Sequence, residues 1–187
     1  FLANMAPETQ LEILKSFPDS TVFADTMNLW IDIARPQLDE LLGKIDGLVL
    51  NDGEARMLTG EQNLILAGAA LQKRGPKFVI IKKGEHGAFL FTPEEKFGLL
   101  AYPVSEVVDP TGAGDSFAGG MMGALATTGD LSAKSIHRAM AYGTICASFT
   151  VQDFSVRALE QVSMEDIEAR YQEFSSFLSF SGHFACR

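Results

Sequence analysis

Short apolar runs alternate with longer segments of helical period through the N-terminal half of this chain. The apolar runs predict strands at residues 21–25, 45–50, 78–82, 87–91 and 99–104. Between them, apolar side chains recur at the three- and four-residue spacing of an α-helix, over residues 7–17, 31–42, 53 onward and 64–73. Strands that alternate with helices form a mainly parallel sheet covered by helices on both faces. The sequence therefore predicts an α/β fold with three layers, α-β-α.

Length and composition limit the classes of protein that fit. The 187 residues suffice for one domain with a sizeable core, and we expect a single domain over residues 1–187 with a tail from about residue 178. The net charge of −9 argues against a nucleic-acid partner. Cys146 and Cys186 form neither a disulfide framework nor a zinc pattern. No apolar run could span a membrane and no signal peptide leads the chain, so we expect a cytoplasmic protein.

A glycine-rich turn lies between the apolar run at residues 102–108 and a helix predicted from Phe117 onward. The turn consists of Gly112, Ala113 and Gly114. The first N–H groups of a helix have no partner inside the helix, and with the helix dipole they form a site for a phosphate or a developing oxyanion. Asp115 follows the turn directly, and its carboxylate would serve as an ionised base. Such donors beside a carboxylate are what transfer of a phosphoryl group to an alcohol requires.

The same turn fits three other known types of glycine-containing segment to different degrees. A Gly-Ala-Gly-Asp sequence is also an ordinary loop and helix cap, and for an arbitrary sequence of these four residues that interpretation holds more often than the phosphate site. The dinucleotide-binding fingerprint is excluded because it requires a third glycine where Phe117 stands. The ATPase phosphate loop is excluded because it requires a lysine, and residues 97–133 contain none.

The longer block from Asp109 to Gly120, DPTGAGDSFAGG, is similar to the second signature of the PfkB (ribokinase-like) family of sugar and nucleoside kinases. The resemblance runs from the first residues to about Phe177, and the family's N-terminal part and lid have no counterpart here. It implies that Asp115 removes the proton of the acceptor hydroxyl, while the amides of residues 112–114 hold the charge of the transferred group. The implied reaction moves the γ-phosphoryl of ATP, with Mg²⁺, to a hydroxyl of a sugar or sugar-like acceptor.

Asn51 and Glu54 stand three residues apart where a strand gives way to a helix. Locally this spacing predicts a capping box, in which each side chain bonds to the other residue's backbone N–H. In the resembled family an Asn-x-x-Glu at this place lies by the ATP phosphates, and the glutamate orders water around magnesium. Both interpretations can hold together, since magnesium prefers carboxylates, waters and phosphates.

Four further positions take a nucleotide-binding role from the resemblance. Lys82, Gly84 and Gly87 match a Gly-x-x-Gly segment that lines the nucleotide, although locally the segment predicts only a hairpin turn. Members often carry threonine or serine where Lys82 stands, so this lysine either reaches a phosphate or is simply solvated. Tyr142 stands near the adenine position by register, but a tyrosine on a helix also fits a core position.

The resemblance also places ions and the acceptor. Asp109 and the carbonyl of Thr111 match positions that hold a monovalent cation, K⁺, in many members, and the alternative is a loop aspartate that caps the turn. Members usually supply a glycine to that site from the segment that is residues 148–157 here, and residues 150–155 contain none. Asp25 and Asn28 are similar to an acceptor-side segment of some sugar kinases, although an aspartate after a strand is also a common helix cap.

Asp25, Asn51, Lys82 and Asp109 each follow a predicted strand, so we expect them on one rim of the sheet. Two other functional classes stay open: a non-catalytic nucleotide-binding or regulatory domain of the same fold, and a structural or interaction module. The resemblance allows a homodimer and leaves the acceptor unnamed. The chain opens with Phe1 in a strand-like run, and we expect it to be a piece of a longer protein.

Overall fold

The computed structural model describes residues 1–179 and divides into two compact units, Phe1–Ala101 and Tyr102–Arg187. The strands of the first unit are β1 (Phe23–Asp25), β2 (Gly47–Asn51), β3 (Phe78–Lys82), β4 (Ala88–Phe91) and β5 (Lys96–Leu99). Its helices are α1 (Pro7–Leu14), α2 (Asn28–Ile33), α3 (Arg35–Leu42), α4 (Asp52–Thr59) and α5 (Leu64–Gln72), with a 3-10 turn η1 (Gly84–His86). The second unit has α6 (Ala113–Thr128), α7 (Ala133–Thr150), α8 (Arg157–Glu160) and α9 (Met164–Leu178).

The strands of the first unit pair in the order in which the chain forms them, β1-β2-β3-β4-β5. β1, β2 and β3 run parallel, and β4 and β5 continue the sheet as antiparallel neighbours. In this register Asn51 of β2 stands beside Lys82 of β3. The carboxyl ends of the parallel strands therefore meet at one edge, where α/β proteins commonly bind ligands.

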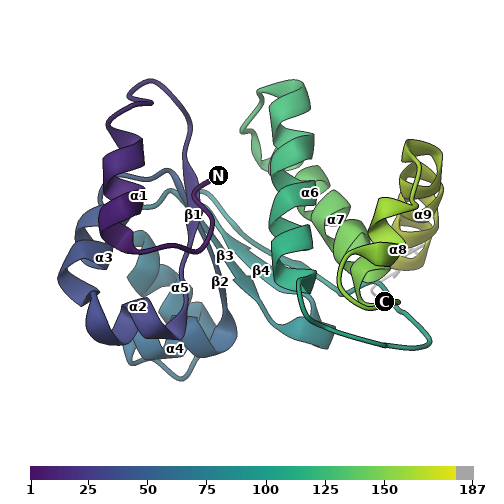
Figure 1. Cartoon of the computed structure of the whole chain (residues 1–187), viewed down its shortest axis with the longest axis horizontal. Coiled ribbons are helices and arrows are strands. Elements are labelled where there is room, and N and C mark those ends of the chain that lie inside the picture. The colour runs from purple at the N-terminus through teal and green to yellow at the C-terminus, as the bar shows by residue number, and fades with distance from the viewer. Residues whose placement is uncertain (180–187) are drawn as a thin grey trace, which may run out of the picture. The chain divides into compact units, whose positions relative to one another are not determined.

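Helices α1 to α5 cover one face of this sheet (Figure 1). Side chains alternate between the two faces of a strand, and Leu48 and Leu50 of β2 point into the helix-covered core. Val49 and Asn51 consequently lie on the opposite face. The same alternation puts Lys82, the neighbour of a core isoleucine, on that opposite face too. The polar ends of β2 and β3 thus share one face as well as one edge.

In the second unit, α6 and α7 pack closely because glycines face the partner helix. A Cβ added at Gly143 of α7 would lie 2.5 Å from the carbonyl oxygen of Phe117 in α6. Phe117, Met121 and Leu125 are buried, as their four-residue spacing predicts. This helix pair supports the turn that precedes α6.

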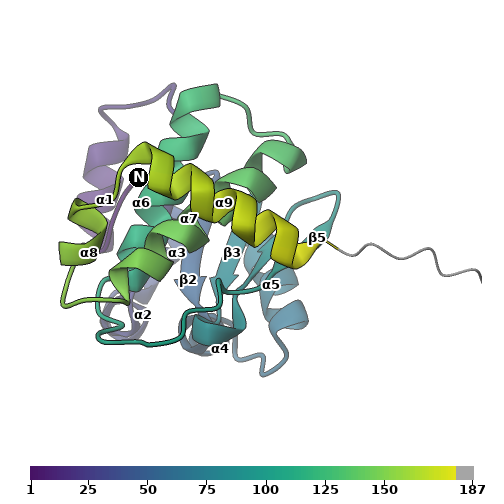
Figure 2. The same cartoon turned by 90° about the vertical axis from the view of Figure 1, so that its right-hand side faces the viewer.

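Helix α9 lies along α7 (Figure 2). The Arg170 guanidinium stands 3.4 Å above the centre of the Phe149 ring and donates a hydrogen bond to Ser148 Oγ at 3.0 Å. Burial lowers the pKa of Arg170. The arginine covers an aromatic ring and satisfies a buried hydroxyl at once, so it links α9 to α7.

The structure corrects several predicted elements. The helix expected over residues 31–42 is two helices that meet at Ala34, since Pro36 lies in the first turn of α3. The strand expected over residues 99–104 is wrong, because β5 ends at Leu99. Residues 102–108 form no strand either. The N–H groups of Val108 and Asp109 donate to the Val151 carbonyl at the end of α7, so Asp109 does not follow a strand as predicted.

None of the helices in the described part of the chain is long and apolar enough to cross a membrane. Cys146 is a buried free cysteine, whereas Cys186 lies outside the described residues. Most of the predicted tail also lies outside them, and its first residue, Leu178, is the last residue of α9. That residues 1–187 form a single domain stays a prediction.

Candidate functional site

The turn before α6 has a backbone conformation that selects glycine. Gly112 is the N-cap residue of α6 and has φ +80°, in the left-handed region. A residue with a Cβ pays about 1–2 kcal/mol there. Helix N-termini are usually capped by serine, threonine, asparagine or aspartate, whose side-chain oxygen accepts a hydrogen bond from a backbone N–H. No side chain caps α6 in this way, and we call such an uncapped helix start open.

The free donors at this turn differ from the predicted set by one residue. The Ala113 N–H donates to the Pro110 carbonyl at 3.2 Å, so it is engaged within the turn. The N–H groups of Gly112, Gly114 and Asp115 have no partner within residues 1–179. The Asp115 side chain is exposed and makes no hydrogen bond within the same residues. Three backbone donors and one carboxylate are therefore available to a ligand at the start of α6.

A buried hydroxyl pair holds the start of α6 against the end of α7. Thr150 Oγ1 donates to Ser116 Oγ at 2.7 Å, and both side chains are buried. Such a bond contributes about 0.5–1.5 kcal/mol net, and leaving one partner buried and unpaired costs more. Neither hydroxyl was predicted to matter, since nothing in the spacing of Ser116 and Thr150 marks them as a pair. They keep the turn in place.

Asp109 is held by its own loop. Its Oδ1 accepts a hydrogen bond from the Thr111 N–H at 2.9 Å. The hydrogen bonds from the N–H and the hydroxyl of Thr111, together with one from the Ser155 N–H, lower the pKa of Asp109. Ser155 has φ +58°, a conformation more usual for glycine, at the segment where the resembled family supplies a glycine. Asp109 thus caps its own turn, as one of the two interpretations of this residue predicts.

At the polar edge of the first unit, Asn51 and Glu54 form the predicted capping box. The Glu54 N–H donates to Asn51 Oδ1 and the Asn51 N–H donates to Glu54 Oε2, both at 2.8 Å. Glu54 is only 8% exposed. Burial raises the pKa of Glu54, and the Asn51 hydrogen bonds and the positive charge of Lys82 offset part of that rise.

Lys82 stands next to this box without a partner of its own. The residue is partly buried, and within residues 1–179 its side chain makes no hydrogen bond and no ion pair. Asp25 ends β1 on the same face of the sheet and is 7% exposed. The carboxyl edge of the parallel strands therefore presents two buried acids, an asparagine and a lysine. Of the four predicted rim positions, the first unit brings together Asp25, Asn51 and Lys82.

The predicted hairpin turn between β3 and β4 is present as residues 83–87. The Lys83 N–H donates to the Gly87 carbonyl at 2.7 Å. Gly87 has φ +83°, and a Cβ there would lie 2.0 Å from the Leu99 carbonyl oxygen at the end of β5. Only glycine fits so close to β5. Gly84 also has a positive φ, +56°, and open space around it.

Tyr142 packs against α9. Its ring stacks on Tyr171 with a centroid distance of 4.9 Å, and its hydroxyl donates to Glu168 Oε2 at 2.8 Å. The protein thus covers one face of the ring. Asn28, which the resemblance places on the acceptor side, is the exposed first residue of α2.

Gln10 is a residue near Asp25 that the sequence interpretation missed. It is 1% exposed, and its Nε2 lies within 3.2 Å of the carbonyl oxygens of Leu2, Ala3 and Asp25. The amide thereby fixes the first residues of the chain beside the end of β1. A signal was available, because Gln10 precedes Ile13 and Leu14 at helical spacing on the buried side of α1.

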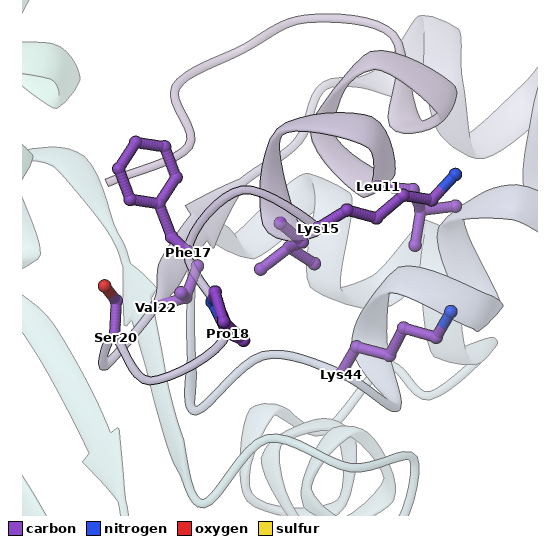
Figure 3. A pocket seen from close by; sticks show the side chains of 8 residues that line it. Leu11, Lys15, Phe17, Pro18, Ser20, Val22 and Lys44 are labelled. Atoms are coloured by element: carbon purple, nitrogen blue, oxygen red, sulfur yellow. The ribbon is translucent and has the colours of Figure 1, made fainter.

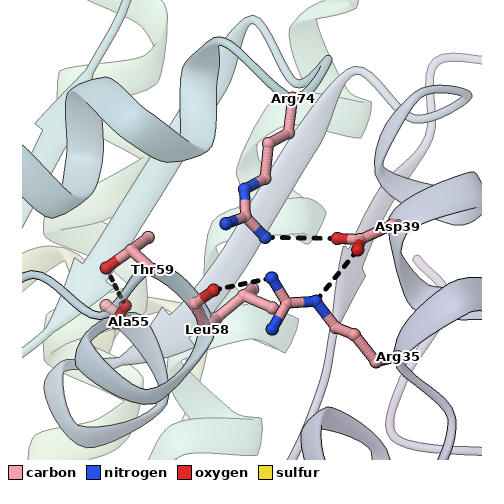
Figure 4. A network of polar contacts seen from close by, with 6 residues as sticks. All are labelled: Arg35, Asp39, Ala55, Leu58, Thr59 and Arg74. Carbon is pink, nitrogen blue, oxygen red and sulfur yellow. Dashed lines mark hydrogen bonds and ion pairs between the residues drawn. The ribbon is translucent and has the colours of Figure 1, made fainter.

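Two other features of the first unit do not belong to this edge. A shallow pocket of about 240 Å³ lies at the opposite end of β1, next to Val22 and between Lys15 and Lys44 (Figure 3). On the helices, Asp39 is bound by both Arg35, at 3.0 Å, and Arg74, at 3.1 Å (Figure 4). Its carboxylate is occupied by these partly exposed arginines, so the cluster is structural and of modest strength.

Comparisons with known proteins agree with this architecture. Residues 7–162 match the model of the pfkB family carbohydrate kinases. The chain is 31% identical over 125 residues to the cytidine kinase of Thermococcus kodakarensis, and the match covers 65% of this chain and 45% of that kinase. The ribokinase structure from Thermotoga maritima aligns with a TM-score of 0.74 and 28% identity, over 91% of this chain and 56% of that one.

A second solved structure is that of an Escherichia coli protein assigned as ribokinase II, in complex with ATP and Mg²⁺. It aligns with a TM-score of 0.71 and 29% identity, over 89% of this chain and 53% of that one. The chain spans about half the length of the relatives it matches. The likeness confirms the predicted ribokinase-like α/β fold class. Because the family model matches well over half of its residues, the chain belongs to the pfkB family of carbohydrate kinases.

Proposed function

We propose that the protein transfers the γ-phosphoryl of ATP to a hydroxyl of a sugar or sugar-like acceptor. The observation that carries this proposal is the open start of α6, where the N–H groups of Gly112, Gly114 and Asp115 are free beside the Asp115 carboxylate. Family membership makes the same reaction the expected one. Since the chain spans only about half of its relatives, the activity of the whole protein remains a proposal.

In this proposal the residues at the start of α6 perform the transfer. The three free amides point at the charge that develops on the moving phosphoryl group, and each well-placed donor contributes on the order of 3 kcal/mol. Asp115 takes the proton of the attacking hydroxyl, which contributes about 10²–10⁴-fold in rate. The engaged amide of Ala113 serves to shape the turn rather than to bind the charge.

The nucleotide and its metal are assigned to the polar edge of the first unit. The E. coli protein was solved with ATP and Mg²⁺, which supports the same cofactors here. Glu54 fits a magnesium role because it is a fixed, buried carboxylate at the strand ends. The described residues contain no cluster of three acidic, histidine or cysteine side chains, so Glu54 would hold the ion only together with water and phosphate oxygens. Asn51, Gly84 and Gly87 would line the nucleotide.

The remaining site residues are assigned to the monovalent cation, the adenine and the acceptor. Asp109 and the Thr111 carbonyl would hold a monovalent cation such as K⁺, although the loop already satisfies Asp109. Tyr142, whose ring stacks on Tyr171 and lies 5.5 Å from the Arg138 guanidinium, would lie near the adenine. Asp25 and Asn28 would contact the acceptor. The matched relatives include a ribokinase and a cytidine kinase, so a ribose-containing acceptor fits best. The proposal includes a homodimer as the assembled form of the protein.

The test is Asp115→Asn in an active form of the protein, with ATP, Mg²⁺ and a panel of sugars and nucleosides. We expect kcat to fall by about 10²–10⁴-fold, because the base is lost, while nucleotide affinity changes little. Glu165→Gln is a matched control, since Glu165 is an exposed acid in the first turn of α9. An unchanged kcat would remove Asp115 from the mechanism. ATP binding without turnover of any acceptor would favour a non-catalytic nucleotide-binding domain.

A further inference from the structure

Lys82 and Glu54 carry opposite charges at the polar edge, yet neither charge is fully compensated by the protein. Glu54 is buried and accepts a hydrogen bond from the Asn51 N–H, and burial is the main influence on its pKa. Lys82 influences the carboxylate electrostatically, but the two groups form no ion pair within 4 Å. The Lys82 ammonium makes no hydrogen bond and no ion pair within residues 1–179, so it is available to an anionic ligand at this edge.

The backbone explains why Lys82 faces this edge while the next lysine does not. Lys82 pairs in register with Asn51, so its Cα stands about 4.8 Å from the residue that caps α4. Lys83 follows it and turns to the other side, where its ammonium lies 3.6 Å from the centre of the Phe89 ring. The chain thus holds two adjacent lysines, one satisfied by an aromatic ring and one unsatisfied beside a buried acid.

The charges at this edge also define what the lysine can bind. A polyphosphate that approaches without a metal meets the negative charge of Glu54 and of a protein with net charge −9. Mg²⁺ removes this repulsion at Glu54 when it is bound. Without Mg²⁺, a positively charged side chain near Glu54 would reduce the repulsion between Glu54 and the phosphates. Lys82, which pairs with Asn51 in the sheet, is such a side chain.

We propose that Lys82 is a direct phosphate ligand that gives this protein an affinity for ATP that does not depend on Mg²⁺. This inference rests on the proposed function and specifies which side chain at the edge of the first unit binds the phosphates of the nucleotide. With Mg²⁺ present, the metal takes over the charge of Glu54, and Lys82 contributes less. Without Mg²⁺, the ammonium is the group that neutralises Glu54 and meets the phosphate.

The experiment measures ATP binding by calorimetry, with Mg²⁺ and with EDTA in its place, for the unaltered protein, Lys82→Met, Lys82→Arg and Lys83→Met. Met keeps most of the apolar stem of lysine and removes the charge. In EDTA we expect Lys82→Met to weaken ATP binding by about tenfold to a hundredfold, the range for a charge-assisted hydrogen bond. With Mg²⁺ the loss should be several times smaller. Lys82→Arg should retain most of the affinity, and Lys83→Met should lose less than about twofold in EDTA.

The outcomes separate this inference from the proposed function. Equal losses for Lys82→Met and Lys83→Met in EDTA, or no ATP binding by the unaltered protein in EDTA, would overturn the role of Lys82 while binding with Mg²⁺ keeps the kinase proposal. A protein that binds ATP under neither condition would overturn both. Thermal unfolding of each variant identifies a loss that comes from misfolding, and Lys82→Arg then provides the deciding measurement because it keeps the charge.

Discussion

The N-termini of α4 and α6 both carry an acidic residue in the first turn, and they treat it in opposite ways. At α4, Asn51 caps the helix and Glu54 returns a hydrogen bond, so the protein satisfies its own donors. At α6, Gly112 has no side chain to offer, and the N–H groups of Gly112, Gly114 and Asp115 have no protein partner within residues 1–179. Glu54 is buried, whereas Asp115 is exposed.

The cap residue accounts for the difference. The side chain of a capping asparagine accepts a hydrogen bond from the N–H of the third helical residue. In a capping box, the acidic side chain of that third residue accepts a hydrogen bond from the asparagine N–H in return. A glycine in the left-handed region reverses the chain without occupying any donor, so the donors and the acid stay available. A closed helix start fixes a side chain in place, and an open one presents backbone groups to a ligand. The proposed phosphoryl transfer would use both properties, at different positions.

The largest expected effect comes from giving the open start a side chain. Gly112→Ala should lower the free energy of unfolding by about 1–2 kcal/mol, because alanine is strained at φ +80°. It should also weaken ATP binding, since the free amides shift as the turn relaxes. The matched control is Gly119→Ala in the middle of α6, where a Cβ meets nothing within 4 Å, so stability should rise by about 0.5–1 kcal/mol. Urea unfolding compares the two, and equal stabilities would contradict the strain argument.

A smaller effect is expected from opening the closed start. Asn51→Ala removes the cap and should cost about 1 kcal/mol of stability. Ser163→Ala removes the cap of the same kind of box at α9, where Ser163 and Asp166 bond to each other's backbone, and should cost a similar amount. Only Asn51→Ala should weaken ATP binding, measured by calorimetry. If both variants bind ATP equally well, the box at α4 is a cap and nothing more.

The smallest effect is a pH dependence of stability from Glu54. Burial raises the pKa of this carboxyl above its ordinary value of 4.5, so the folded protein holds the proton more tightly than the unfolded chain does. Relative to Glu54→Gln, which keeps an acceptor for the Asn51 N–H, the unaltered protein should gain stability as the pH falls from neutral through the raised pKa toward 4.5. Urea unfolding across this range measures the difference, and a constant difference would show that burial does not perturb Glu54.

Much of the first unit followed from the sequence. The alternation of apolar runs and helical segments predicted strands at the places of β1 to β4, and the spacing of Asn51 and Glu54 predicted both hydrogen bonds of the capping box. The four-residue spacing of Phe117, Met121 and Leu125 identified the buried side of α6. These features are local, because each depends on residues close together in the chain.

Features that depend on distant partners were not predicted. The apolar run before Asp109 resembles a strand, but the N–H group of its last residue, Val108, donates to the Val151 carbonyl across the unit. The Thr150–Ser116 hydrogen bond joins residues 34 positions apart, and the sequence around neither residue predicts it. The engagement of the Ala113 amide depends on the conformation of Pro110, which a motif does not specify. The functional roles of the site residues stay predictions until the experiments above are done.

The sheet of the first unit has a consequence for how the polypeptide acquires its structure. Within the described residues its strand order follows the chain, so each of β2 to β5 joins the strand made immediately before it and none is inserted between two earlier ones. Proteins rich in such short-range pairings generally fold faster than those that must close long loops first. During synthesis, when domains form from the N-terminal side onward, this sheet can grow by one strand at a time as the chain emerges from the ribosome.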